Sequence, residues 1–514
     1  MTGFESLLGV LLAAVLLAAV ARRVGAPYPA FLALGGAVLA FLPGAPAFSI
    51  DPTVALALFV APVLLDAAYD SSPRDLKDNW VPVVSLAVVC VVLSTLAVAV
   101  VARALVPAMP WAVAITLGAI VSPPDAAAAT AVLRQLRPPH RILTILEGES
   151  LLNDASALLI YRLAVGAVAV NTFSIGTLAP TLAVVVVGSV VVGIALAGLM
   201  MRLMRQVGDA PTSIILQFIS TFGVWILADR LGLSSVLTMV SYAITAARSA
   251  PERMPARIRI PSYAVWESAV FVLNVLAFVF IGLQIRPILT SVAPGTRTRY
   301  LLVAGAVLVT VIVIRIAWVM THNTVYRWKI RRFGFHPPRS MSPPTLGSGL
   351  VISWSGMRGI ISLAAALALP AGQGGFPYRD LIVVTAFAVV LGTLVVQGLT
   401  LRPLIKALDL HDDDPVGREV EVARQRALEA ALATCAGDGS PAAEAVRHEF
   451  DAHLNRAAAS PASTGETLST HEEIHGRALA AARRVVLDMR ARDDIGDDAF
   501  HRLEEEFDWM EMRS

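Results

Sequence analysis

The stretch ILEGESLLNDASALLIY, residues 145–161, decides how this chain is interpreted. Its isoleucines and leucines indicate a buried helix, yet Glu147, Glu149, Asn153 and Asp154 fall within it. Charged groups in an apolar helix are costly, and they face protein or water rather than lipid. The stretch therefore predicts a functional site in an apolar environment.

The composition of the whole chain indicates a membrane protein. Of its 514 residues, 56% are hydrophobic and 16% are charged, whereas a soluble protein carries about 25% charged residues. Apolar runs long enough to cross a hydrocarbon core of ~30 Å recur along the first four fifths of the chain. We therefore expect an all-α polytopic membrane protein rather than a large soluble domain.

The apolar runs predict about thirteen transmembrane helices. Their ranges are 4–20, 28–43, 53–69, 80–103, 110–133, 142–168, 177–201, 211–228, 233–247, 262–285, 300–321, 348–370 and 381–403. With the N-terminus outside, the inner connections hold three times as many Arg and Lys residues as the outer ones. This bias predicts a cytoplasmic C-terminus. The scarcity of lysine among the basic residues suggests a bacterial source, and hence the bacterial inner membrane.

The composition changes after Leu410, where acidic residues come to outnumber basic ones. We therefore divide the chain into a transmembrane domain, 1–410, and an acidic helical cytoplasmic tail, 411–514. Six of the nine histidines lie in this tail, which makes a cytoplasmic pH sensor an open hypothesis. HEEIH, residues 471–475, fits a zinc-protease pattern, but no convincing third ligand follows, and solvated surface histidines are the favoured interpretation.

The polar residues of 145–161 fall on two neighbouring faces of the expected helix. Ser150 and Asp154 are four residues apart and share a face with Glu147, whereas Glu149 and Asn153 lie on the next face. The first face offers hydroxyl and carboxylate oxygens, which suit a hard cation. A buried arginine could neutralise the second face.

Two other spans carry interruptions. AIVSPPDAAAAT, residues 119–130, contains consecutive prolines that should break the helix in mid-membrane. SWSGMRGIISL, residues 353–363, places glycines on both sides of Arg358. Interruptions at corresponding places in two halves of a chain are typical of inverted-repeat transporters.

At these residues the chain resembles a known family. SPPDAAAATAVLRQL, RILTILEGESLLNDASALL and, further along, WSGMRGIISLAAALALP are similar to stretches of monovalent cation:proton antiporters of the first class. These are the bacterial NhaP-like and eukaryotic sodium/proton exchangers. PVLLDAAYD and GTLVVQGLTLRPLI are two further similar stretches in the same order, so the resemblance covers residues 1 to about 405.

The resemblance implies a sodium/proton antiporter fold that works as a homodimer in the lipid bilayer. It implies that Asp154 takes either a sodium ion or a proton, and that Ser150, Glu149 and the Pro124 carbonyl complete the cation site. Asn153 and Asp125 would support one another, and Arg358 would neutralise Glu149 or Asp125. The family's Thr-Asp-Pro is here Pro124-Asp125-Ala126, and Asp66 stands where a glutamate is usual, so the preferred cation stays open.

The expected function is one-for-one exchange of a monovalent cation, first of all Na+, for H+, in pH and sodium homeostasis. Asn153 resembles a second aspartate without its charge, so the loaded states carry equal charge and exchange should be electroneutral. A K+/H+ antiporter of the same fold is the alternative, and a cation channel is a more distant one. We expect no enzyme activity, no cofactor and no nucleic-acid partner. Glu267, Asn274 and Arg315 are assigned to helix packing.

Overall fold

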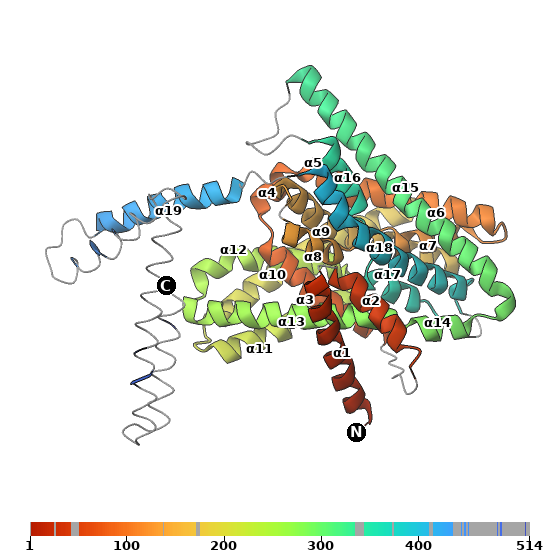
Figure 1. Ribbon diagram of the computed structural model, residues 1–514, viewed down its shortest axis with the longest axis horizontal. Helices are drawn as coiled ribbons and strands as arrows, with labels where there is room; N and C mark the ends of the chain where they lie inside the picture. Colours follow the sequence, from red (N-terminus) through yellow and green to blue (C-terminus); the bar gives the residue numbers. More distant parts are fainter. Residues whose placement is uncertain are drawn as a thin grey trace. The chain divides into compact units, whose positions relative to one another are not determined.

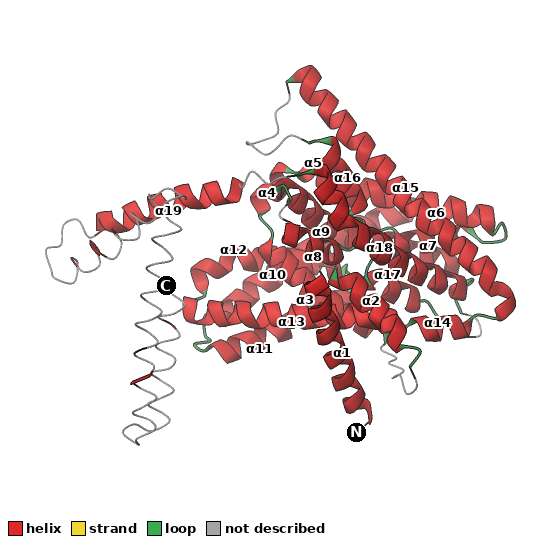
Figure 2. Ribbon diagram, viewed as in Figure 1, coloured by secondary structure: helices red, strands yellow, loops and turns green. Residues whose placement is uncertain are grey.

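The computed structural model describes residues 2–24, 27–42, 51–136, 138–170, 175–334, 344–372, 375–410 and 415–434, with isolated residues beyond. These residues form helices and loops, and no strand occurs among them (Figure 2). The chain divides into two compact units, Met1–Asp413 and Asp414–Ser514. In the second unit α19 spans Pro415–Thr434, and residues 471–475 lie outside the described residues.

The first unit contains all the expected membrane spans (Figure 1). Its unbroken long helices are α1 (Thr2–Val24), α3 (Pro52–Asp70), α9 (His140–Val170), α10 (Ile175–Met204), α11 (Ala210–Arg230), α12 (Ser235–Arg253), α13 (Ala256–Leu283), α15 (Pro294–Phe333) and α18 (Arg379–Leu408). The shorter helices are α2 (Tyr28–Leu39), α4 (Pro73–Asp78), α5 (Trp80–Val84), the π-helix η1 (Ser85–Cys90), α6 (Val91–Leu105), α7 (Trp111–Val121), α8 (Ala126–Leu136), α14 (Ile285–Ser291), α16 (Leu346–Trp354) and α17 (Ile360–Leu367).

These helices confirm an all-α polytopic membrane protein. Among the described residues, eight helical segments are long and apolar enough to cross a membrane. Each of the predicted ranges nevertheless coincides with a helix or with a consecutive set of helices. The count of thirteen spans stays a prediction.

Aspartates cap the beginnings of two spans. The Thr53 hydroxyl and the backbone amides of Thr53 and Val54 donate hydrogen bonds to Asp51 and hold the pKa of its carboxyl below the usual value. The backbone amide of Thr212 donates to Asp209 at 2.8 Å and lowers the pKa of that carboxyl in the same way. Both carboxylates satisfy N–H groups that a helix leaves unpaired at its start.

Small residues let α2 and α13 pack backbone against backbone. A Cβ added to Gly282 would lie 2.1 Å from the carbonyl oxygen of Ala33, so no larger residue fits there. Close approach of this kind is how helices associate in a membrane, where no hydrophobic driving force brings them together. This contact fixes one wall of the cavity described below.

Both predicted interruptions are real. The first separates α7 from α8 at Ser122–Asp125, and the second separates α16 from α17 at Ser355–Gly359. The two breaks meet, because the amide of Asp125 donates to the carbonyl of Met357 at 2.6 Å. In Figure 1 the long helix α15 runs along α16 and α18, beside the second break.

Candidate functional site: a cation cavity at the broken helices

Asp154 is the buried carboxylate around which the site is built. It lies on α9, is 5% exposed, and lines a cavity of about 210 Å³. Within the described part of the chain, the structure gives its carboxylate no hydrogen bond and no ion pair. An isolated carboxylate is costly to bury unless it takes up a proton or a cation.

The cavity is lined by further oxygen-bearing side chains from several helices. Ser150 and Glu147 line it from the same face of α9, as the spacing predicts. Polar or charged side chains from other helices complete the lining; these are Asp66 on α3, Asp125 at the first break, Thr130 on α8 and Asn274 on α13. Carboxylate, hydroxyl and amide oxygens are the ligands of a hard cation.

Asp125 is held tightly against the second break. Its carboxylate accepts a hydrogen bond from the amide of Ala127 at 2.9 Å. Its Oδ2 lies so near Gly359 that a Cβ on that glycine would be 1.7 Å away. Gly359 directly precedes α17, so the carboxylate sits near the positive end of that helix, which favours negative charge.

Asn153 points away from the cavity and toward the first break. Its Nδ2 donates to the carbonyl of Pro124 at 2.9 Å, and the side chain is fully buried. Asn153 therefore contacts the backbone of the residue before Asp125, and the mutual support of Asn153 and Asp125 stays a prediction. Neither Asn153 nor Pro124 is among the described residues that line the cavity.

Glu149 forms a buried ion pair, and its partner differs from the expected one. Nη1 of Arg315 lies 2.5 Å from Oε1 of Glu149, and Nη2 lies 2.8 Å from Oε2. Both side chains are almost fully buried. The expectation that Arg358 neutralises Glu149 or Asp125 is wrong, because Arg315 on α15 pairs with Glu149 and the described side-chain contacts of Arg358 are with backbone carbonyls.

Arg358 instead binds the backbone of both breaks. Its Nε donates to the carbonyl of Val121 at 3.1 Å, Nη2 lies 3.4 Å from the carbonyl of Ser122, and Nη1 donates to that of Gly356. A broken helix leaves such carbonyls without partners, and one guanidinium with five donors satisfies several of them. Arg358 therefore stabilises the crossing of the breaks.

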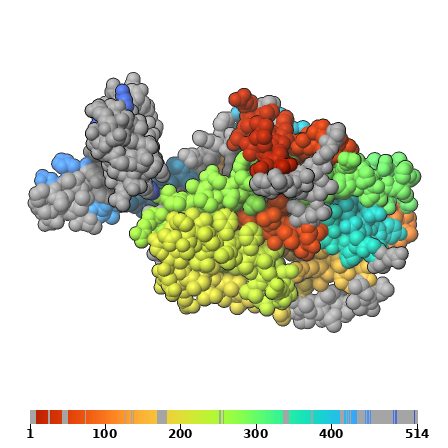
Figure 3. Space-filling model, turned by 90° about the horizontal axis from the view of Figure 1, so that it is seen from below, coloured from red at the N-terminus to blue at the C-terminus, as the bar shows by residue number. Residues whose placement is uncertain are grey.

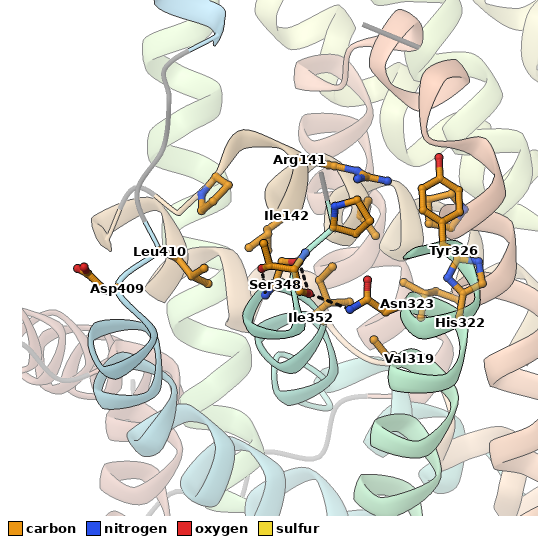
Figure 4. A pocket seen from close by; sticks show the side chains of 17 residues that line it. Arg141, Ile142, Val319, His322, Asn323, Tyr326, Ser348, Ile352, Asp409 and Leu410 are labelled. Atoms are coloured by element: carbon orange, nitrogen blue, oxygen red, sulfur yellow. Dashed lines mark hydrogen bonds between the residues drawn. The ribbon is translucent and has the colours of Figure 1, made fainter. Parts of the chain in front are cut away.

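A separate cavity of about 190 Å³ lies among α9, α15 and α16 (Figure 4). Arg141, His322 and Tyr326 line it, and Asn323 donates to the carbonyl of Thr345 at 2.8 Å. The only carboxylate among its described lining residues is Asp409. It holds none of the residues assigned to cation binding from the sequence.

The cavity adds residues that the sequence interpretation had placed elsewhere. Asn274, assigned to packing, lines it, and Arg315, also assigned to packing, forms the ion pair with Glu149. The sequence did indicate that Glu147 lies on the cavity side of α9, because its spacing puts it on the same face as Ser150 and Asp154. No comparable periodic signal marks Asn274, because it comes from a distant helix.

Gly359→Ala tests the close approach of the two breaks. The new methyl group would displace Asp125 and break its hydrogen bonds to Met357 and Ala127, so we expect any activity that depends on Asp125 to fall about tenfold or more. Transport assays on equal amounts of purified protein measure this. Gly305→Ala is the control, since apart from its own helix backbone and chain neighbours nothing lies within 4 Å of its Cβ position. Equal activity of both variants would contradict the proposed geometry.

Comparison with known proteins gives the family. The family model "Sodium/hydrogen exchanger, transmembrane" matches residues 10–407. An uncharacterized Na(+)/H(+) exchanger of Mycobacterium tuberculosis is 32% identical, over 96% of this chain and 92% of that protein. A sodium, potassium, lithium and rubidium/H(+) antiporter of Bacillus subtilis is 27% identical, over 95% of this chain and 74% of that protein.

The fold has a match among solved structures. The sodium proton antiporter MjNhaP1 from Methanocaldococcus jannaschii superimposes with a TM-score of 0.61 at 18% identity, over 79% of this chain and 97% of that one. The chain belongs to the sodium/hydrogen exchanger family, which is a family of transporters and not of enzymes.

Proposed function

We propose that this antiporter exchanges a monovalent cation, first of all Na+, for H+ at Asp154. The observation that carries the proposal is a buried carboxylate that faces a cavity and has no partner in the described part of the chain. Such a group binds either a proton or a cation. Two substrates that compete for one group are exchanged when the group faces each side of the membrane in turn.

The surrounding residues have distinct parts in this proposal. Ser150 supplies a hydroxyl oxygen one helical turn from Asp154, and Asp125 supplies a further carboxylate in the same cavity. Pro124 is not among the described residues that line the cavity, so in this proposal its carbonyl, held by the Asn153 amide, positions the first break and does not bind the cation. Glu149 supports the site as half of an ion pair with Arg315 rather than as a ligand.

The test is proton movement driven by each alkali cation. The purified protein is placed in liposomes that carry a pH gradient and a pH-sensitive dye, and Na+, K+, Li+ or Rb+ is added in turn. Saturable, cation-dependent dequenching is the expected result, with Na+ as a substrate. K+ as the preferred cation would favour the K+/H+ alternative. The name of the Bacillus subtilis relative includes potassium among its cations. A current without coupled proton movement would indicate a channel.

Asn153→Asp tests the stoichiometry. The new carboxylate would be fully buried beside the Pro124 carbonyl, where a neutral amide now donates. Burying an unpaired charge is costly, so we expect exchange either to fall more than about tenfold or to respond to membrane potential. A potassium gradient with valinomycin imposes the potential in the liposome assay. A voltage-sensitive wild type would contradict electroneutral exchange.

The proposal also includes the oligomeric state of the protein, its membrane and its orientation. We place it as a homodimer in a bacterial inner membrane, with the N-terminus outside and the C-terminus in the cytoplasm. The excess of Arg and Lys in the inner connections supports this orientation. Residues 411–514 would form a regulatory cytoplasmic tail, in a chain that maintains pH and sodium balance without a bound cofactor.

A further inference from the structure

A second and larger cavity adjoins the cation cavity. It has a volume of about 580 Å³ and lies among α3, α10, α11, α12 and α13, and we call it the vestibule. In Figure 3 the yellow and yellow-green helices of this group form one block next to the red N-terminal helices. The vestibule and the cation cavity share four lining residues: Tyr28, Asp66, Val270 and Asn274.

The wall contributed by α13 shows where the vestibule leads. Its lining residues on this helix are Arg259, Ser262, Tyr263, Trp266, Glu267, Val270, Phe271 and Asn274. They recur every three or four positions and so form one face of the helix. From Arg259 to Asn274 this face rises about 22 Å, at about 1.5 Å per residue. The vestibule therefore runs from the beginning of α13 to the cation cavity.

The vestibule is lined by aromatic side chains and methionines, with oxygens from Gln217, Ser220, Ser262 and Glu267 between them. The aromatic residues are Tyr28, Tyr69, Tyr242, Tyr263, Trp266 and Phe271, and the methionines are Met200, Met201, Met204 and Met254. Where the two cavities meet, Asp66 from α3 and Asn274 from α13 provide a carboxylate and an amide. A hard cation that loses water at this point needs oxygen ligands in exchange.

We infer that Asn274 is a specificity-determining residue at the junction of the vestibule and the cation cavity. Its amide oxygen takes the place of one water of the entering monovalent cation, while Asp66 lines the same junction. An amide contributes an oxygen without adding a charge. It therefore favours cations that give up one water molecule readily over cations that hold their water more strongly. The inference rests on the proposed exchange at Asp154.

The first test compares Asn274→Leu with Tyr263→Phe. Leucine keeps the approximate size of the side chain and removes its oxygen. We expect the Na+ concentration for half-maximal flux to rise about tenfold, the effect of losing one such contact to a charged group, with little change in maximal flux. Tyr263→Phe removes an oxygen from the vestibule but not from the junction, and should behave as the wild type.

The second test does not depend on how well a leucine is tolerated. In a chain in which Cys90 and Cys435, its two cysteines, are replaced by alanine, Asn274→Cys should react with a small cationic methanethiosulfonate. Saturating Na+ should slow that reaction about tenfold or more, because the entering ion occupies the junction. No reaction in an active protein, or a reaction that Na+ does not slow, would overturn the inference.

Different results would refute the proposed exchange at Asp154 and the inferred role of Asn274. A wild-type protein without cation-dependent proton flux would refute the exchange itself. An active wild type with unchanged half-maximal Na+ in Asn274→Leu would refute the role of Asn274 alone.

Discussion

Asp154→Asn is expected to reduce cation-dependent proton flux to background while the protein stays folded in the membrane. Asparagine preserves the shape of the side chain, but it carries no charge to hold a cation and takes up no proton near neutral pH. The cavity keeps Ser150 and Asp125, so binding oxygens remain but the group that alternates between substrates is lost. Dye dequenching in liposomes measures the flux, and a thermal melt measures the fold.

Asp229→Asn is the matched control for this variant. Asp229 is an exposed aspartate near the end of α11 that pairs with Arg162 at 2.9 Å, and it is not among the described residues that line the cation cavity or the vestibule. The same change of charge and shape there should leave flux within about twofold of the wild type, because exposed ion pairs contribute little. Exchange retained in Asp154→Asn would remove Asp154 from the mechanism.

Glu149→Gln should produce the largest loss of stability. It leaves the Arg315 guanidinium, which is 1% exposed, without its carboxylate in the interior of a membrane protein. Breaking a buried pair by removing one partner costs about 3–5 kcal/mol. The expected result is a comparable fall in the free energy of unfolding, seen as a large drop in melting temperature in detergent.

A double variant distinguishes the effect of an unpaired Arg315 from the effect of changing residue 149 itself. Glu149→Gln combined with Arg315→Met removes both charges, and replacing a buried pair by uncharged groups is often neutral. We therefore expect the double variant to be more stable than Glu149→Gln alone. If the double variant is less stable than the single one, the destabilisation does not come from an unpaired arginine.

The helices could be predicted because their signals are local. Apolar runs gave the ranges of the long helices, and Pro123 and Pro124 marked the first break. Gly356 and Gly359 marked the second. That the two breaks touch, through the amide of Asp125 and the carbonyl of Met357, could not be predicted from residue spacing, since these residues are more than two hundred positions apart.

The arginine partner of Glu149 shows where sequence reasoning fails. Two buried arginines were available, Arg315 and Arg358, and neither is near Glu149 in the chain. Arg358 lies within a break and so resembles a functional residue more than Arg315 does. The structure favours Arg315 because Arg358 is already needed by the carbonyls of the two breaks. Competition among distant polar groups decides such pairings, and it depends on the packing of the whole fold.

The backbone of the two breaks has a consequence for how this transporter can evolve. The carbonyls of Val121 and Gly356 accept from Arg358, that of Pro124 accepts from Asn153, and that of Met357 accepts from Asp125. Fixed protein donors thus occupy much of the main chain that the breaks expose. Most of the oxygens open to a passing ion then belong to side chains, each encoded by one codon. Descendants of this chain could change the ion they prefer by single substitutions on α9 or α13, without rebuilding the crossing itself.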